Sequence, residues 1–294
     1  MKKLSRVLCA VDVDTPGRAA FARALAIART AGARLLIVCP VPPLQAFDQQ
    51  GMERTMYLSA LREEAEAAGV EVRASVQHGE AAGVVAVHAA ARRADLIVVS
   101  AAHGRRDARP MGAVAEAVIR RATCPTLVVQ ESDRPKAVGF TRAVCAVELS
   151  ASAETIVAQA HRLIDASKPD VTLLHVVDGP QGGLDTTFAR GLIRDYYRHL
   201  SIAAFKRLRA LVPKDRARTT RARIALGDAA DEIRRVAGEF EADLLVVGAS
   251  LRGRIGQRLH GVARQLLAER RCAVLAVPAT PGRAGRGDQW PLAA

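Results

Sequence analysis

The chain has 294 residues, enough for two domains of ordinary size with a sizeable core each. Half of the residues are hydrophobic and only 3% are aromatic, so the core must consist mostly of Ala, Val, Leu and Ile. The formal net charge of +13 comes chiefly from arginine. No basic run is dense enough for a nucleic-acid-binding tail, so we favour solvated helix faces as the place of these side chains.

The sequence argues against a membrane-spanning or secreted protein. No run approaches the ~18 apolar residues of a membrane span, and the first apolar stretch, which stops at Asp12, is too short for a signal peptide. The five cysteines lie next to apolar residues and form no C-x-x-C, which predicts small buried side chains in a reducing compartment. We therefore expect a cytoplasmic protein.

Predicted strands and helices alternate along the first half. A strand at 6–11 runs into Asp12, and Thr15 can cap a helix that has Pro16 at its first position and ends at Gly32. A second strand at 34–39 is expected to stop at Pro40. Further strands are predicted at 70–76, 95–99 and 126–130, and further helices at 52–68, at 80–93 and around Val114–Ile119.

The last part of this half recurs further along the chain. The stretch Ala91–Gln130 is matched by Gly238–Pro278, and three pairs of residues lie at one common offset of 148 positions: Gly79 with Gly227, Asp95 with Asp243, and Cys124 with Cys272. Three anchors at one offset with no gap between them indicate an internal duplication.

The second half repeats the order of the first. AVCAVE at 143–148 repeats VLCAVD at 7–12, which puts Glu148 where Asp12 stands. A helix at 152–166, the strand VTLLHVV, a Gly-rich loop and a long helix beginning near Phe188 follow, and then a strand that ends at Gly227 and a helix at 229–240. We place a linker at 131–139 and expect domains at 1–133 and 138–280, with a disordered tail at 281–294.

This alternation predicts an α/β fold. Strands that alternate with helices form βαβ units with right-handed crossovers, and hence a parallel sheet with helices on both faces. In such sheets ligands bind where the strands end at their carboxyl side. Helix N-termini at that edge favour anions.

The sequence resembles the universal stress proteins, specifically the tandem two-domain type. The resemblance covers roughly residues 5–279 and rests on VLCAVD and AVCAVE, on LLHVV, and above all on ADLIVVSAAHG…GAVAEAVIRRATCPTLVV and its partner ADLLVVGAS…GVARQLLAERRCAVLAV. It implies two Rossmann-like (HUP-type) domains, each a five-stranded parallel sheet between helices. The two domains would pack as a pseudo-dimer through their last strands.

Many members of this family bind ATP or AMP through a loop of pattern G-x2-G-x9-G-[ST], and this chain departs from that pattern in both halves. In the first half Ser100 and His103 stand at the first two glycine positions, Gly104 comes one place late, and Gly112 is followed by Ala113. In the second half Gly248 keeps the first position, and Leu251 stands at the second. His260 or Gly261 stands at the third, so the residue after it is Gly261 or Val262 and never Ser or Thr.

The resemblance nevertheless implies a set of candidate nucleotide-binding residues. They are Asp12, Val38, His103, Gly104, Gly112 and Ala113 in the first half, and Glu148, Val176, Gly248, Gly253, Gly261 and Val262 in the second. Loop arginines could replace lost phosphate contacts, because a guanidinium pairs well with phosphate oxygens: Arg105, Arg106, Arg109, Arg252, Arg254 and Arg258. The alternative is an exposed loop that became basic after phosphate binding was lost. The sequence does not decide which half would bind.

Other chemistries find little support. There is no G-x-x-x-x-G-K-[ST], no G-x-G-x-x-G, no H-E-x-x-H and no nucleophile turn, so we name no catalytic residue and no metal site, and expect Mg only together with ATP. His103 and His260 lie in the loops and are candidates for function. His175, inside LLHVV, is more typical of a satisfied strand residue.

Two functions therefore stand side by side. One is a stress-response regulator that binds ATP or AMP, with at most weak ATPase activity. The other is a nucleotide-independent scaffold for a protein partner or another small ligand. Under either function the two-domain chain could form a further homodimer. Nucleic-acid binding is disfavoured, because aromatic residues are not interleaved with the arginines.

Overall fold

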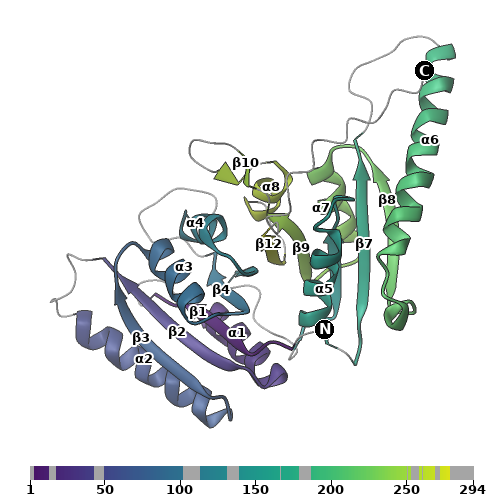
Figure 1. Cartoon of the computed structure of the whole chain (residues 1–294). Helices are drawn as coiled ribbons and strands as arrows, with labels where there is room; N and C mark the ends of the chain where they lie inside the picture. The colour runs from purple at the N-terminus through teal and green to yellow at the C-terminus, as the bar shows by residue number, and fades with distance from the viewer. Residues whose placement is uncertain are drawn as a thin grey trace.

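A single ten-stranded sheet runs through the chain (Figure 1). The computed structural model describes residues 3–12, 18–42, 50–101, 113–130, 139–165, 167–178, 187–249, 251–252, 258–259, 261–268 and 272–278. The strand order is β3-β2-β1-β4-β5-β12-β9-β6-β7-β8, so the first five strands and the last five form two equal blocks. Within each block every pair of neighbouring strands is parallel.

The elements of the first half follow the predicted order. They are β1 (Arg6–Ala10), α1 (Arg18–Ala31), β2 (Arg34–Val41), α2 (Gln50–Ala67), β3 (Val72–His78), α3 (Ala81–Ala91), β4 (Leu96–Ser100), α4 (Ala113–Arg121) and β5 (Thr126–Val129). One prediction was wrong: β2 continues through Pro40. The last register pair of β1 with β2 is Ala10 with Val38, so Pro40 lies beyond that ladder and its missing N–H costs no bond to β1.

The second half repeats this order with a longer outer helix. It contains β6 (Arg142–Ala146), α5 (Ala153–Leu163), β7 (Asp170–Val177), α6 (Thr187–Ala210), a short 3-10 turn (Lys214–Arg216), β8 (Thr220–Leu226), α7 (Ala229–Glu239), β9 (Leu244–Ala249), β10 (Leu251–Arg252), β11 (Arg258–Leu259), α8 (Val262–Ala268) and β12 (Ala273–Pro278). The hairpin of β10 and β11 was not predicted. The proposed cap Thr15, residues 131–138 of the predicted linker and the predicted tail at 281–294 lie outside the described residues.

The two halves join through their last strands. β12 pairs antiparallel with β5, with Val274 opposite Val128 and Leu275 opposite Leu127. The junction is therefore a continuous hydrogen-bonded ladder, and the expected pseudo-dimer of two five-stranded parallel sheets is confirmed.

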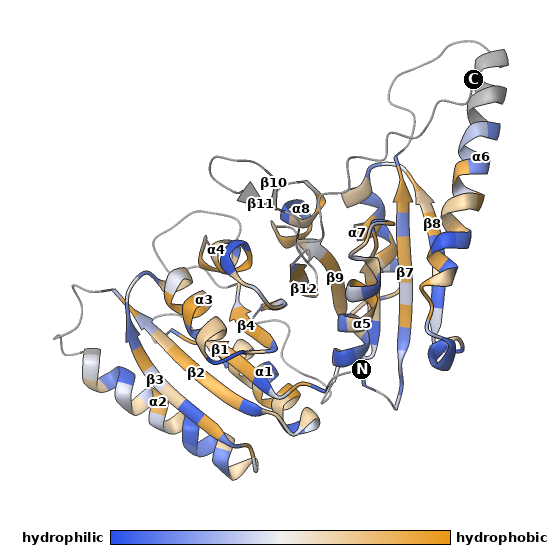
Figure 2. Cartoon of the chain, in the orientation of Figure 1, coloured by the Kyte–Doolittle hydropathy of each residue, from blue (hydrophilic) through white to orange (hydrophobic). Residues whose placement is uncertain are grey.

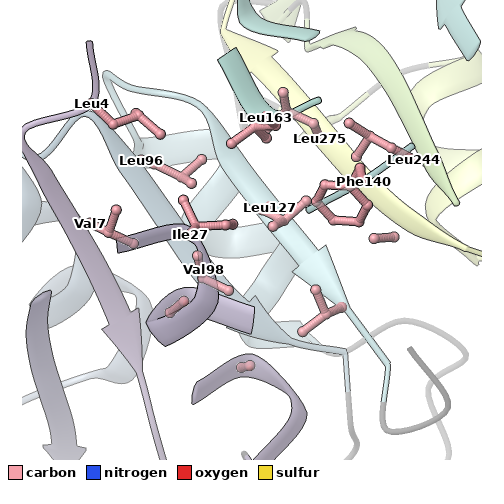
Figure 3. Packing of buried hydrophobic residues seen from close by; sticks show 14 of the residues in the cluster. Leu4, Val7, Ile27, Leu96, Val98, Leu127, Phe140, Leu163, Leu244 and Leu275 are labelled. Atoms are coloured by element: carbon pink, nitrogen blue, oxygen red, sulfur yellow. The ribbon is translucent and has the colours of Figure 1, made fainter. Parts of the chain in front are cut away.

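Helices cover both faces of the sheet and divide the core into two layers. One layer lies under α1, α2, α5 and α6, and the other under α3, α4, α7 and α8. Apolar residues dominate the central strands in Figure 2, whereas the helices alternate polar and apolar positions. Figure 3 shows the first layer crossing the junction, where Leu127 of the first half lies near Phe140 and Leu275 of the second.

The repeated residues have matching local roles. The side chain of Asp95 accepts hydrogen bonds from the backbone N–H groups of Ser5 and Arg6, and Asp243 accepts from those of Thr141 and Arg142. Each carboxylate thereby fixes the start of the strand beside it, β1 or β6.

The repeated glycines serve a different purpose at the ends of β3 and β8. Gly79 and Gly227 have φ of +145° and +143°, which L side chains rarely adopt, so glycine is required where the chain turns into α3 and α7.

Candidate functional site

A cavity of about 380 Å³ opens at the carboxyl ends of β6, β7 and β9. This is the edge of a parallel sheet at which ligands bind in α/β folds. Its volume lies within the range of small-molecule sites. Residues from the strand ends and from helices on both faces line it: Ala146, Val147, Glu148, Ser152, Ile156, Leu174, His175, Val176, Asp178, Ala229, Ile233, Val247, Gly248, Val262 and Ala263.

Two carboxylates stand at the mouth of this cavity. Glu148 follows β6 and Asp178 follows β7, directly after Val177, and both residues are exposed. Neighbouring parallel strands end at the same edge, which explains why two residues 30 positions apart meet there. Paired carboxylates offer acceptors for hydroxyl or amine donors of a ligand.

His175 lies on β7 and lines the cavity beside them. Its Nδ1 is 2.8 Å from the backbone carbonyl oxygen of Val147. A carbonyl oxygen can only accept, so in the neutral imidazole Nδ1 carries the proton and Nε2 remains an acceptor. The sequence predicted a satisfied strand residue, and one ring nitrogen is indeed satisfied. The contact with the cavity was missed.

The walls of the cavity are apolar, and one of them depends on a glycine. Ile156 from α5 and Ile233 from α7 face it from opposite sides of the sheet, with Val176 between them on β7. A Cβ at Gly248 would stand 3.2 Å from Cδ1 of Ile156, which is tighter than an ordinary van der Waals contact. The absence of a side chain at Gly248 therefore keeps this end of the cavity open.

The chain between β9 and α8 folds back on itself. β10 and β11 pair antiparallel, which places Arg252 directly opposite Arg258 in the backbone register. β11 also contacts α4 of the first half. The segment predicted as a phosphate loop thus forms a small hairpin that starts beside the cavity and reaches toward the first half.

The structure brings together some of the predicted site residues and leaves others apart. Four line the cavity, all in the second half: Glu148, Val176, Gly248 and Val262. Gly261 immediately precedes α8 with a φ of +64°. In the first half Asp12 follows β1, Val38 is buried in β2 and Ala113 begins α4. His103, Gly104, Gly112, Gly253, His260 and the arginines Arg105, Arg106, Arg109 and Arg254 lie outside the described residues.

Several lining residues were not predicted. Asp178 directly follows VTLLHVV, so its place at the end of a strand was readable from the sequence. Ser152 and Ile156 lie one helical turn apart on α5, a spacing that also fits ordinary core packing, and nothing in the sequence separates the two roles.

Burial suppresses the reactivity of three of the five cysteines. Burial raises the pKa of Cys9 and of Cys145 to about 12. Burial, together with the nearby carboxylate of Asp95, raises the pKa of Cys124 to about 11. These thiols stay protonated near neutral pH and are therefore poor nucleophiles. Within the described residues, no cluster of three or more His, Cys, Asp or Glu side chains is arranged to hold a metal ion.

The family model described as the universal stress protein family matches this sequence twice, over residues 3–130 and 139–278. The chain belongs to the universal stress protein family. The two matches coincide with the two blocks of the sheet, so it is a tandem member.

No curated protein sequence gives a match. Among the described residues, no helix combines the length and apolar character needed to cross a membrane.

Solved structures share this fold at low sequence identity. A functionally unknown protein from Pseudomonas aeruginosa PAO1 is 16% identical with a TM-score of 0.68, covering 94% of this chain and 92% of its own. A universal stress protein from Archaeoglobus fulgidus DSM 4304 is 13% identical with a TM-score of 0.64, covering 92% and 98%. Both likenesses show the tandem fold. A universal stress protein from Archaeoglobus fulgidus in complex with dAMP matches one half only, with 22% identity, a TM-score of 0.36 and coverage of 43% and 98%.

Proposed function

We propose that the second half of this tandem universal stress protein binds an adenine mononucleotide in the cavity at the ends of β6, β7 and β9, and that the protein acts as a nucleotide-responsive regulator in the stress response. The cavity itself is the observation that carries the proposal. It combines a volume of about 380 Å³, apolar walls and two carboxylates at the strand edge used for ligands in this class of fold.

Each part of a nucleotide finds a suitable surface there. The apolar side chains of Ile156, Val176 and Ile233 suit the faces of a base. The carboxylates of Glu148 and Asp178 suit the two ribose hydroxyls, which are hydrogen-bond donors. Phosphate binding is assigned to the hairpin that begins next to Gly248, whose register sets Arg252 opposite Arg258.

The register of the hairpin arginines supports an anionic ligand. A guanidinium pairs well with phosphate oxygens, so two arginines at paired backbone positions would suit a phosphate group. Because arginine replaces the missing loop hydroxyl in this scheme, we expect one phosphate to suffice. AMP should therefore bind at least as well as ATP with Mg.

The alternative is a scaffold that ignores nucleotides. It is favoured by the missing loop hydroxyl, because the family's Ser or Thr position is occupied here by Gly261 or by Val262, which lines the cavity. The two functions differ in a direct observation: a nucleotide-binding protein should retain or take up adenine nucleotide, and a scaffold should not.

The test begins with denaturation of the purified protein and mass spectrometry of what is released, followed by calorimetric titration of the emptied protein with AMP and ATP. Glu148→Ala should weaken AMP binding, whereas Asp12→Ala, its counterpart in the first half, should leave the affinity unchanged. An emptied protein that gives no heat with either nucleotide at millimolar concentration would favour the scaffold. Loss of binding in Asp12→Ala alone would move the site to the first half.

A further inference from the structure

The two outermost helices occupy equivalent places at opposite ends of the molecule. α2 covers the edge strand β3 and α6 covers the edge strand β8, on the same face of the sheet (Figure 1). Each of them follows the second strand of its half. Side chains on the outward faces of α2 and α6 therefore lie at the two far ends of the sheet.

The outward face of α2 carries an apolar and acidic stripe. Met52, Met56, Ser59, Glu63 and Glu66 follow one another at steps of four, three, four and three residues, which places them on one side of the helix. That side lies opposite Leu61 and Ala65, which are buried in the core. Met52 is 74% exposed and Met56 67%, so two large flexible apolar side chains stand in solvent at the head of this acidic stripe.

The outward face of α6 carries the complementary stripe. Arg198, Ile202, Phe205 and Arg209 are spaced by four, three and four residues and lie away from the buried Leu208. Ile202 is 47% exposed and Phe205 39%. Two apolar side chains thus stand between two arginines, a pattern typical of a docking face for an acidic partner.

The charges of the two helices have opposite signs. α2 contains four glutamates and two arginines, one of which, Arg54, is buried. α6 contains six basic residues and one acidic one. Among the described residues, the side chains of Glu63, Arg198 and Arg209 enter no ion pair, whereas Glu66 of the α2 stripe pairs with Arg62 at 3.8 Å. In a molecule with a net charge of +13, the acidic stripe of α2 is a suitable target for the basic stripe of α6.

A hollow beside the α2 stripe offers room for a large side chain. It lies between α2 and β3 and has a volume of about 540 Å³. Ser59 and Glu66 of the stripe line it together with the apolar side chains of Leu58, Val72 and Val76, and Arg62 and Arg73 belong to the same lining. An aromatic ring placed there would contact the apolar side chains and lie near one carboxylate and two guanidinium groups, over whose cations an aromatic face packs favourably.

We propose that α6 of one molecule docks on α2 of a second copy of this chain. The contact pairs Ile202 and Phe205 with Met52, Met56 and the hollow beside them, and pairs Arg198 and Arg209 with the glutamates of the α2 stripe. Such a contact joins two different surfaces, so it either repeats into a chain of molecules or closes where two copies exchange both contacts. It uses no residue of the nucleotide cavity and is independent of nucleotide binding.

Sedimentation velocity of the full-length protein tests the contact, over roughly a hundredfold range of protein concentration. The weight-average mass should rise above the 31.3 kDa of one chain as concentration increases. Phe205→Glu combined with Ile202→Glu should hold the protein at the mass of one chain. Val87→Glu serves as the control, because Val87 is 70% exposed on α3, on the other face of the sheet, and this change should leave the association intact.

Charge reversal distinguishes this contact from any other self-association. Glu63→Arg with Glu66→Arg makes the α2 stripe basic, and Arg198→Glu with Arg209→Glu makes the α6 stripe acidic, so each protein alone should associate less than the unchanged chain. Mixing the two restores opposite charges across both contacts and should restore association. Circular dichroism establishes that each variant is folded. A wild-type protein of one-chain mass throughout, or reversed variants that associate as before or fail to recover on mixing, would overturn the proposal.

Discussion

Arg23 of the first half stacks on Phe140 of the second. Arg23 belongs to α1, and Phe140 lies in the chain just before β6. The guanidinium carbon of Arg23 is 4.2 Å from the centroid of the Phe140 ring. Arg23 is 6% exposed and Phe140 1%, so this cation–π contact is almost fully shielded from water. It adds a specific side-chain contact to the junction already made by the pairing of β5 with β12.

The energy of this contact can be measured with a double-mutant cycle of Arg23→Met and Phe140→Leu. Because the pair is desolvated, we expect a coupling energy of about 1–2 kcal/mol in urea unfolding. Arg18 and Phe21 form the matched pair, since Arg18 is half-exposed and its guanidinium lies 5.6 Å from the ring centroid. Their coupling should be smaller. If the losses in unfolding free energy of Arg23→Met and Phe140→Leu sum to the loss of the double variant, the stacking contributes nothing to stability.

Asp243 anchors the start of β6, and its removal should destabilise the second half. Its carboxylate accepts from the N–H of Thr141 at 2.8 Å, from the Thr141 hydroxyl at 2.9 Å and from the N–H of Arg142 at 3.0 Å. Asp243→Ala leaves these donors unpaired at a half-buried site, so we expect a loss of about 2–4 kcal/mol in urea unfolding. Glu241→Ala, which removes an exposed ion pair with Arg142, should cost less than about 1 kcal/mol. Equal losses in both variants would contradict the anchoring role.

The repeat made the architecture predictable, because residues 148 positions apart mark the same place in each half. Asp95 and Asp243 located the start of a strand, and Gly79 and Gly227 located the end of the strand that precedes it along the chain. The sequence did not reveal that the two aspartates hold the first strand of each half. Their partners lie 89 or more residues earlier and, apart from the Thr141 hydroxyl, are backbone N–H groups, which carry no side-chain signal.

The candidate site was harder to predict, because it depends on how strand ends meet. Glu148 was found from its equivalence to Asp12, but Asp178 and His175 became visible only when the register of β6 with β7 set them beside it. The hairpin was missed because its strands contain two residues each, too few to show any periodicity.

Gly227 and Gly238 give a contrast between a required glycine and a dispensable one. Gly227 has a φ of +143°, and a Cβ there would lie 3.2 Å from Cγ of Glu232, so Gly227→Ala should lower the free energy of unfolding by about 1–3 kcal/mol. Gly238 is exposed in α7 with no atom within 4 Å of its Cβ position, and Gly238→Ala should raise that energy by about 0.5–1 kcal/mol. Relative to the wild type, the melting temperature should fall in Gly227→Ala and rise in Gly238→Ala. Melting temperatures that change in the same direction would refute this explanation.

His161 should make stability fall with acidification. It is buried in α5 with Nδ1 unpartnered among the described residues, and Nε2 lies 3.5 Å from the Thr220 hydroxyl. Burial lowers the pKa of His161 below the ordinary value of 6.5, and the Arg216 guanidinium lowers it further, while Asp215 acts in the opposite direction. As the pH falls, His161 is therefore protonated at a higher pH in the unfolded chain than in the folded one. The free energy of unfolding consequently decreases as pH drops below about 6.5.

The variant His161→Gln isolates this effect from the other titrating groups. We expect it to lose less stability than the wild type between about pH 7.5 and pH 5.5 in urea unfolding. His199→Gln provides the control, since His199 is exposed on α6. A pH dependence that is the same in His161→Gln and the wild type would exclude His161 as its source.

The most direct test of the nucleotide site closes the cavity at Gly248. Gly248→Val puts a branched side chain against Ile156, whereas Ser100→Val changes the equivalent position in the first half, the last residue of β4. Calorimetric titration with AMP should show that Gly248→Val weakens binding by roughly tenfold or more, about 1.4 kcal/mol, while Ser100→Val binds as the wild type does. Unchanged AMP affinity in a folded Gly248→Val protein would contradict a nucleotide site in the second half.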